Sequence, residues 1–245
     1  HFETPRFLAG FTRGGFGEMT RTVHRFSAKH LSSKYWAQRP RPVVFNTFSC
    51  IRRTELTEQG VLDLIPKAAE VGCELFIIDD GWQTDVGNWT VHPKNFPNGL
   101  KKIAESVKAH GMKFGLWMEF EVVVPQSRLW TERPEWVLGD GAAQLNLARE
   151  DAFEYICDTI RTLIRENDIA YFKMDMNHYL FVPAFHEHRR EIKTKYMLNF
   201  YRLMRRLNEE FPQVIFENCA SGSGRCDLEM DRYFCRTNRS DNQDT

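Results

Sequence analysis

Residues 169–177 read IAYFKMDMN, and this stretch decides the choice of fold. Its first part is a short, nearly continuous apolar run, which is typical of a strand buried on both faces of a parallel sheet. Asp175 and Asn177 follow at the carboxyl end of that run. Because a carboxylate is costly to bury without partners, its place here indicates either a structural ion pair or the edge of a site.

The same arrangement recurs along the chain. Further short strand-like runs are found at residues 43–48, 75–78, 113–121, 214–218 and 236–242. Segments with apolar residues at helical spacing separate most of these runs, at residues 57–71, 100–110, 151–166 and about 187–211. Pro66 is expected to end or kink the first of these helices unless it falls near the start of the helix. The alternation predicts an α/β protein with six parallel strands.

Polar residues at the strand ends decide between an open sheet and a closed one. They are Asn46, Asp79–Asp80, Trp117–Glu119, Asp175–Asn177, Glu217–Asn218 and Asp241–Asn242. A barrel gathers the carboxyl ends of all its strands around one mouth, where barrel enzymes place their chemistry, whereas an open sheet spreads them along an edge. We therefore predict a (β/α)8 TIM barrel truncated to about six β/α units, two short of a full barrel.

The first part of the chain has a different character. Residues 1–41 alternate poorly, end in the breaker run Arg39-Pro40-Arg41-Pro42, and are expected to form a connector with one helix around Met19–Leu31. Residues 42–245 are expected to form the partial barrel. The first residue is not Met and no apolar signal core follows it, so we expect the chain to begin inside a longer protein.

Composition excludes several classes of partner. Lys plus Arg equals Asp plus Glu at 33 each, so no net charge favours nucleic acid or an anionic membrane. No apolar run approaches the roughly 20 residues that span a bilayer. The six cysteines are irregularly spaced and include no CxxC pair, which is typical of reduced thiols rather than a zinc site or a disulfide framework.

Two aspartates are candidates for catalysis. Lys173 lies two residues before Asp175 on the same strand face, and a nearby ammonium would hold that carboxylate ionised, as a nucleophile requires. Asp241 lies near the end of the chain in SDNQD. Two carboxylates on opposite sides of a pocket are what glycoside hydrolysis needs. A structural Lys–Asp pair and helix capping remain open interpretations for these residues.

Three other motifs could line a sugar site. Adjacent Asp79 and Asp80 could reach one ligand if Gly81 turns the chain, and an indole beside them would suit a hexose. A turn carboxylate with a helix cap is the alternative. Trp117 could equally be a core residue. The segment ENCASGSGR at 217–225 is Gly-rich but lacks the ending of a P-loop, so close backbone approach to a ligand is expected.

The order and spacing of seven motifs resemble those of glycoside hydrolase family 36, the α-galactosidases and their relatives. The motifs are VVFNTF, LFIIDDGW, NFPNGL, FGLWMEFE, KMDMN, ENCASGSGR and SDNQD, and they span essentially the whole chain. The leading segment GFGEMTRTVHRF is similar to the stretch that joins the family's N-terminal β-sandwich domain to its barrel. The motif order identifies the chain as a member of this family and implies a catalytic-domain fragment that lacks two β/α units and a C-terminal β-domain. We expect such a fragment to be inactive by itself.

The resemblance implies a role for each matching position. Asp175 is the nucleophile and Asp241 the acid/base of a retaining hydrolysis of terminal α-galactosides that uses no metal and no cofactor. The residues implied to bind the sugar are Asp79, Asp80, Trp117, Lys173, Asn177, Cys219 and Gly222. The implied partner is an α-linked oligosaccharide, in a bacterial-type cytoplasmic protein whose parent could be homo-oligomeric.

Departures from the family pattern fall in the shell that reads the sugar. The usual EPE is replaced by Glu119-Phe120-Glu121, an Arg-containing stretch by 141–144, and a Trp by Met174. The same pattern is therefore compatible with an α-N-acetylgalactosaminidase or an isomaltose-type α-glucosidase. Transglycosylation and a silent sugar-binding protein are further alternatives within the family.

A metal-dependent barrel hydrolase is the alternative from another class. It would use Asp79, Asp80, Glu119 and Asp175 around a divalent ion, because hard ions favour oxygen clusters. His178 or the cluster at 186–188 would assist, although histidines at the start of a long polar helix are typical of a solvated surface.

Overall fold

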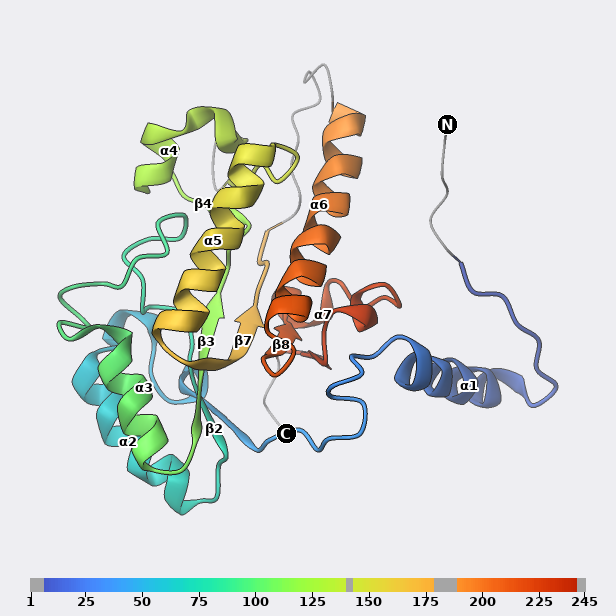
Figure 1. Cartoon of the computed structure of the whole chain (residues 1–245), viewed down its shortest axis with the longest axis horizontal. Helices are drawn as coiled ribbons and strands as arrows, with labels where there is room; N and C mark the ends of the chain where they lie inside the picture. The colour runs from blue at the N-terminus through green and yellow to red at the C-terminus, as the bar shows by residue number, and fades with distance from the viewer. Residues whose placement is uncertain (1–6, 140–142, 179–188, 242–245) are drawn as a thin grey trace.

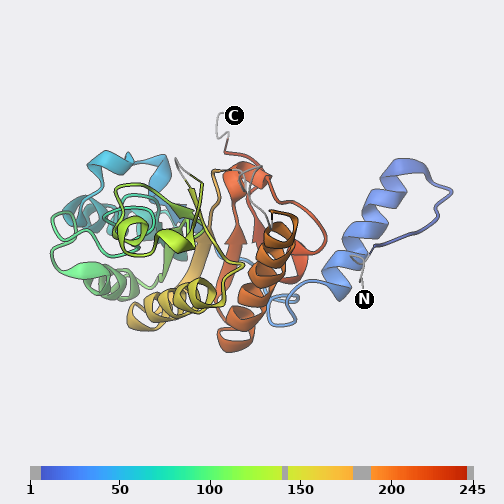
Figure 2. The same ribbon diagram turned by 90° about the horizontal axis from the view of Figure 1, so that it is seen from above.

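The computed structural model describes residues 7–139, 143–178 and 189–241. Its centre is a six-stranded parallel sheet that curls into a half-barrel, as the view from above shows (Figure 2). In spatial order the strands are β1 (Val44–Asn46), β2 (Leu75–Ile78), β3 (Lys113–Met118), β7 (Ile169–Met174), β8 (Ile215–Asn218) and β9 (Arg236–Thr237). The six predicted strands and the truncated TIM-barrel fold are confirmed.

Four helices cover the outer face of the half-barrel (Figure 1). They are α2 (Glu58–Glu70), α3 (Gly99–Ala109), α5 (Glu150–Glu166) and α6 (Arg189–Glu210). The side chain of Thr57 accepts a hydrogen bond from the Gly60 amide and so caps the start of α2. Gly111, at a φ of +78°, lets the chain leave α3 as predicted.

The expectation that α2 ends at Pro66 is wrong, because the helix continues through Pro66 to Glu70. Pro66 lies on the exposed side of α2, between the buried residues Ile65 and Ala68. Water can therefore reach the backbone carbonyl that loses its partner there, and burial of the opposite face stabilises the helix.

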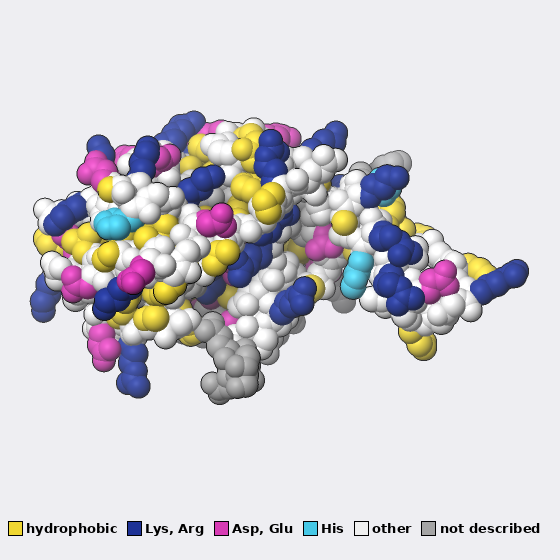
Figure 3. Space-filling view, turned by 90° about the horizontal axis from the view of Figure 1, so that it is seen from below, with side chains coloured by type: hydrophobic (Ala, Val, Ile, Leu, Met, Phe, Trp, Pro, Cys, Tyr) yellow, Lys and Arg dark blue, Asp and Glu magenta, His cyan; other side chains and the backbone are white. Residues whose placement is uncertain are grey.

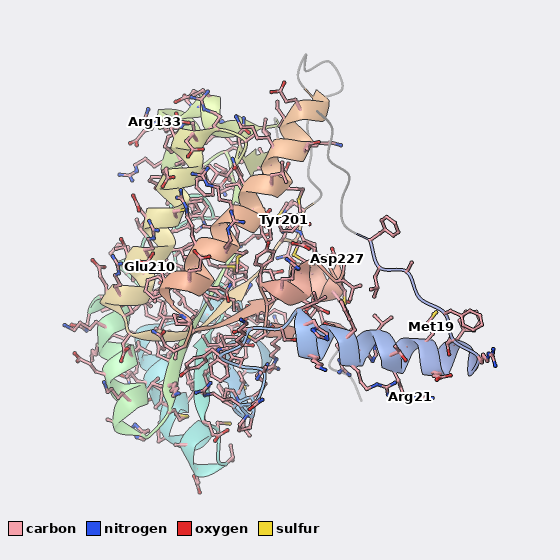
Figure 4. All side chains as sticks on the ribbon, turned by 45° about the vertical axis from the view of Figure 1, so that its right-hand side comes forward. Met19, Arg21, Arg133, Tyr201, Glu210 and Asp227 are labelled. Atoms are coloured by element: carbon pink, nitrogen blue, oxygen red, sulfur yellow. The ribbon has the colours of Figure 1, made fainter. Side chains whose placement is uncertain are left out.

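The first helix, α1 (Gly15–His30), projects away from the half-barrel (Figures 1 and 2). It begins four residues before the predicted helix at 19–31, and Figure 4 places Met19 and Arg21 on this projecting arm. Phe11 and Phe16 expose 87% and 84% of their surface. The chain then returns, and Trp36 packs on the inner face of the half-barrel.

A small antiparallel sheet was not predicted. It consists of β4 (Val122–Val123), β6 (Ala143–Leu145) and β5 (Val137–Leu138) in that order. The predicted strand at 113–121 therefore ends at Met118, and the chain turns before β4. Short helical turns complete the structure: α4 (Arg128–Glu132), η1 (Thr47–Ser49), η2 (Arg53–Glu55), η3 (Pro134–Trp136) and η4 (Met230–Arg232). The element labelled α7 (Ala220–Ser223) is a loop with positive φ values rather than an ordinary helix.

The two faces of the parallel sheet have different neighbours. Outward side chains such as Phe76, Phe172 and Phe216 join the helices in the main core. A smaller cluster lines the inner face, with Trp36 packed on Leu75, Ile77, Tyr171 and Ile215. This cluster forms an apolar floor beneath the carboxyl ends of the strands.

The surface carries charges of both signs. Figure 3 shows Lys and Arg side chains interspersed with Asp and Glu on the face seen from below, in keeping with a net charge of zero. Within the described part of the chain, no helix is long and apolar enough to cross a membrane. All six cysteines fall within that part and are free thiols.

Candidate active site

A layer of polar side chains lies on the inner face, one step beyond the apolar floor. Trp117, Lys173, Glu217 and Arg236 stand next to one another in the register of β3, β7, β8 and β9. Side chains two residues apart share a face, so Lys173 and Glu217 follow the inward-facing Tyr171 and Ile215 of their strands. Asp79 follows the end of β2 and contacts the same layer through Lys173.

Asp175, directly after β7, is buried and holds four hydrogen bonds. Its Oδ1 accepts from the amides of Met176 at 2.8 Å and Ser221 at 3.0 Å. Its Oδ2 accepts from Trp117 Nε1 and Asn177 Nδ2, both at 3.0 Å. Burial, the largest influence, would raise the pKa of this carboxyl, but the four donors outweigh it and lower the pKa. Asp175 is therefore held as an oriented carboxylate.

The predicted reason for the charge of Asp175 needs correction. The Lys173 ammonium does not provide the main stabilisation; its hydrogen-bonded partner is Asp79, with Nζ 2.8 Å from Oδ2. Burial would lower the pKa of Lys173, but the charge of Asp79 raises it, and Asp175 adds a smaller contribution. Lys173 thus belongs to a buried ion pair beside Asp175. The hydrogen-bond donors around Asp175 are what keep its carboxyl group ionised.

The two adjacent acids of the DDGW motif diverge. Asp79 also accepts from Asn46 Nδ2 at 2.8 Å, whereas Asp80 lies 3.3 Å from Arg53 Nη1. Burial is the main cause that raises the pKa of Asp80, with Arg53 opposing it. Gly81, at a φ of +115°, makes the predicted turn, since a Cβ there would lie 2.8 Å from the Arg53 carbonyl oxygen.

The Gly-rich segment after β8 contacts both candidate catalytic residues. Its Ser221 amide donates to Asp175. At Gly222, a Cβ would lie 2.8 Å from the backbone nitrogen of Asp241 and 3.3 Å from its carboxyl carbon. Cys219 Sγ lies 4.0 Å from Asp241 Oδ1. The two aspartates therefore face one short loop, and the expected close backbone approach to a ligand stays a prediction.

Asp241 has a more open environment than Asp175. Its side chain is exposed, and its Oδ1 accepts a hydrogen bond from Asn238 Nδ2 at 2.8 Å. Asn238 Nδ2 also lies 3.5 Å from the thiol of Cys219. These contacts place Asp241 at the rim of the half-barrel, on the far side of β8 from Asp175.

Several further polar residues support the site. Glu119 accepts from the Asn177 amide, and Glu217 is buried with Arg236 Nε 3.6 Å from its carboxylate. Burial above all raises the pKa of Glu217 to about 7. Both glutamates, like Asn46, stand at strand ends, which is the signal that sequence analysis had available.

The contacts of Glu121 were not predicted. Glu121 accepts two hydrogen bonds from Arg225 and one from Tyr196. These residues are 104 and 75 positions apart in the chain, so no spacing pattern relates them.

The described residues contain no group of three or more His, Cys, Asp or Glu side chains arranged to hold a metal ion. Asp79 and Asp80 instead face Lys173 and Arg53. His178 Nδ1 lies 3.5 Å from Glu119. The candidate cluster at 186–188 and the departure at 141–142 lie outside the described residues.

Comparison with known proteins agrees with this architecture. A family model described as Melibiase matches residues 1–245. The chain belongs to the melibiase family. Among curated members it is 34% identical to α-galactosidase AgaA of Geobacillus stearothermophilus, over 99% of this chain and 36% of that protein. It is 36% identical to an Escherichia coli α-galactosidase, over 98% of this chain and 36% of the relative.

Solved structures of melibiases share the fold. A crystal structure of a variant of the family 36 enzyme AgaA, in complex with 1-deoxygalactonojirimycin, superposes with a TM-score of 0.86 at 33% identity. The match covers 92% of this chain and 34% of that one. Other AgaA variants have been crystallised with stachyose and with raffinose. The chain thus spans about a third of the length of the melibiases it matches.

Proposed function

We propose that the protein carrying this chain hydrolyses terminal α-galactosidic bonds in oligosaccharides with retention of configuration. One observation carries the proposal: the loop at 219–222 contacts Asp175 with a backbone amide and Asp241 with Gly222 and Cys219. Two carboxylates on either side of one short loop, at the mouth of a half-barrel, suit the pair of acids that glycoside hydrolysis requires. The α-galactosidase relatives support the sugar class.

Asp175 is the proposed nucleophile. Its lowered pKa keeps it ionised, and its four hydrogen bonds fix its direction. It attacks the anomeric carbon and forms a covalent glycosyl-enzyme, while Asp241 protonates the departing glycosidic oxygen. In the second step Asp241 takes a proton from water, which displaces Asp175 and restores the original configuration.

The surrounding polar layer is proposed to bind the sugar. Asp79, Asp80, Lys173 and Asn177 offer charged and amide groups to its hydroxyls, and Trp117, Cys219 and Gly222 wall the region beside Asp175. The mechanism needs neither metal nor cofactor. Near the sugar site the chain departs from the family pattern at Phe120, 141–144 and Met174. An α-N-acetylgalactosaminide or an isomaltose-type α-glucoside is therefore the second candidate substrate.

The test is steady-state kinetics of the full-length protein on nitrophenyl α-galactoside, α-N-acetylgalactosaminide and α-glucoside, beside Asp175→Ala. We expect the highest kcat/KM on the galactoside and a loss of about 10⁴-fold or more in the variant, because the covalent route is removed. The matched control is Asp63→Ala, which removes an exposed carboxylate on α2.

Each contrary outcome rejects a different part of the proposal. If Asp175→Ala keeps its activity, the assignment of the nucleophile is wrong. If EDTA abolishes activity, the metal-free mechanism is wrong. If the N-acetylgalactosaminide or the glucoside is the preferred substrate, the galactoside assignment is wrong. Product analysis at high acceptor concentration distinguishes hydrolysis from transglycosylation.

A further inference from the structure

The loop that contacts Asp175 has an unusual backbone. Ala220, Ser221, Gly222 and Ser223 follow one another with φ values of +45°, +54°, +72° and +77°. Only the glycine adopts this left-handed region without penalty, and each of the other residues costs about 1–2 kcal/mol. A run of this kind persists only where its surroundings hold it. Specific contacts must therefore hold the backbone at 220–223.

A buried ion pair lies two residues beyond the end of this loop. The Arg225 guanidinium donates to both oxygens of Glu121, at 2.8 and 2.9 Å. Glu121 is only 1% exposed and also accepts from the Tyr196 hydroxyl at 2.6 Å. The guanidinium lies over the ring of Phe200, 4.9 Å from its centroid. Side chains from the turn between β3 and β4, from α6 and from the segment after the loop therefore converge on one point.

The main chain of Arg225 is fixed as well. Its carbonyl oxygen accepts from Asn218 Nδ2 at 2.7 Å, which ties the far end of the loop back to the end of β8. Ser223 Oγ donates to the Arg239 carbonyl oxygen at 3.0 Å on the other side. Figure 4 shows the neighbourhood of this junction, where Tyr201 of α6 and Asp227 lie near each other.

We propose that Arg225 is a positioning residue for Asp175: its ion pair with Glu121 holds the left-handed loop at 220–223 so that the Ser221 amide donates to Asp175 Oδ1. The inference rests on the proposed function, in which Asp175 is the nucleophile. Arg225 acts through the loop, since its guanidinium is bound to Glu121.

The electrostatics of the site agree with this role. Among the groups that lower the pKa of Asp175 against the effect of burial, the Ser221 amide is the largest. Burial would lower the pKa of Arg225, but the charge of Glu121 raises it, so the guanidinium stays protonated. The Arg225 side of the ion pair therefore stays charged across the range in which Asp175 titrates.

A merely structural role for the ion pair is the competing explanation. Buried ion pairs often contribute little net stability, because desolvation offsets their attraction. Stability measurements alone would not separate the two roles. The distinguishing property is the protonation of Asp175, which the Ser221 amide influences through its hydrogen bond to Oδ1.

The test compares Arg225→Met and Arg225→Lys with the parent in the full-length protein, by pH profiles of kcat and kcat/KM on nitrophenyl α-galactoside. Losing one donor to a carboxylate raises its pKa, so the acid limb should move up by about one pH unit and kcat should fall about tenfold. KM should change little. Arg225→Lys keeps a positive charge beside Glu121, so the shift of the acid limb and the loss of kcat should both be smaller than in Arg225→Met.

The matched control is Arg202→Met. Arg202 likewise donates to both oxygens of one glutamate, Glu150 at 2.7 and 2.8 Å, but it joins α6 to α5 away from the site. We expect its pH profile to match that of the parent. An unshifted acid limb in Arg225→Met, or an equal shift in Arg202→Met, would overturn the proposal.

Arg225→Met leaves Glu121 buried without its charged partner and could fail to fold. The double variant Glu121→Gln, Arg225→Met removes both charges, and the same shift is expected of it. Crystal structures of the parent and this variant provide a readout without catalysis. Loss of the contact between Ser221 N and Asp175 Oδ1 supports the proposal, and an unchanged contact overturns it. This readout decides the role of Arg225 even if Asp175→Ala shows that the proposed function is wrong.

Discussion

The two aspartates stand at the ends of strands separated by β8, yet their environments are opposite. Asp175 is 8% exposed and accepts four hydrogen bonds. Asp241 is exposed, and among the described residues its Oδ1 accepts from Asn238 and, at 4.0 Å, from the thiol of Cys219. A nucleophile must be ionised and directed at one atom, whereas an acid/base must exchange a proton with water twice in each cycle. The difference in burial suits this division of work.

Removing the carboxylate of Asp241 tests that division directly. In Asp241→Ala we expect kcat/KM on raffinose to fall by about 10²–10⁴-fold, the usual contribution of a general acid. Nitrophenyl α-galactoside, whose leaving group needs little protonation, should lose much less in the glycosylation step. Kinetics of the full-length variant on both substrates would check this.

The contrast between the two substrates is what matters for Asp241. An equal loss of kcat/KM on raffinose and on the nitrophenyl substrate would indicate a binding role for Asp241. The proposed division of roles between Asp175 and Asp241 would then be wrong. Asp63→Ala on α2 again serves as the control for removal of an exposed carboxylate.

A smaller change should follow from removing one donor of Asp175. In Trp117→Phe the indole N–H at 3.0 Å from Oδ2 is lost while most of the ring remains. The pKa of Asp175 should then rise, which moves the acid limb of kcat/KM upward by about one pH unit, with about a tenfold loss in kcat. pH profiles of the variant and the parent would measure both.

Trp136→Phe is a matched control for Trp117→Phe. Its indole N–H also donates to an aspartate, Asp151 Oδ2 at 3.0 Å, but outside the site. If both variants shift the profile equally, or neither does, the hydrogen bond from Trp117 does not set the protonation of Asp175.

The smallest effect concerns Glu217, which lies on β8 between the two aspartates. Burial raises its pKa from an ordinary value of 4.5 to about 7, against the effect of Arg236, and Asp79 and Asp241 raise it further. Between these two values the folded state holds a proton that the unfolded state has released. Stability is therefore lost as pH rises through this window and stays lower above it.

Glu217→Gln removes this titration. We expect the Tm of the variant, relative to that of the parent, to be a few degrees higher at pH 8 than at pH 5. Thermal unfolding at the two pH values would show the difference, with the exposed Glu209→Gln on α6 as the control. A pH-independent difference would mean that Glu217 is ionised throughout.

Much of the fold could be predicted because it depends on periodicity. The apolar runs before Asp79, Asp175 and Glu217 predicted strands. The polar residues at the ends of these runs predicted the mouth of the barrel. The small sheet of β4, β5 and β6 could not be predicted, because two-residue and three-residue strands have no measurable period. The continuation of α2 through Pro66 depends on burial of the opposite helix face, which propensity ignores.

The site shows the same limit in a sharper form. Sequence predicted which side of β7 Lys173 faces, since alternation fixes it, but not that its partner is Asp79, 94 residues away. The pairing of Glu121 with Arg225 depends on how β3 and the loop after β8 meet in space. Local patterns therefore identify which groups reach the mouth, and tertiary packing decides which charges meet.

The entering segment has a consequence for how this protein can be shortened. Trp36 lies before the predicted start of the barrel at residue 42, yet it covers Leu75, Ile77, Tyr171 and Ile215. A protein that begins at residue 42 would lack Trp36. Its apolar floor would be open to water and would form an exposed hydrophobic surface inside the half-barrel. A series of N-terminal truncations should therefore change from aggregating to folding once the stretch around Trp36 is included.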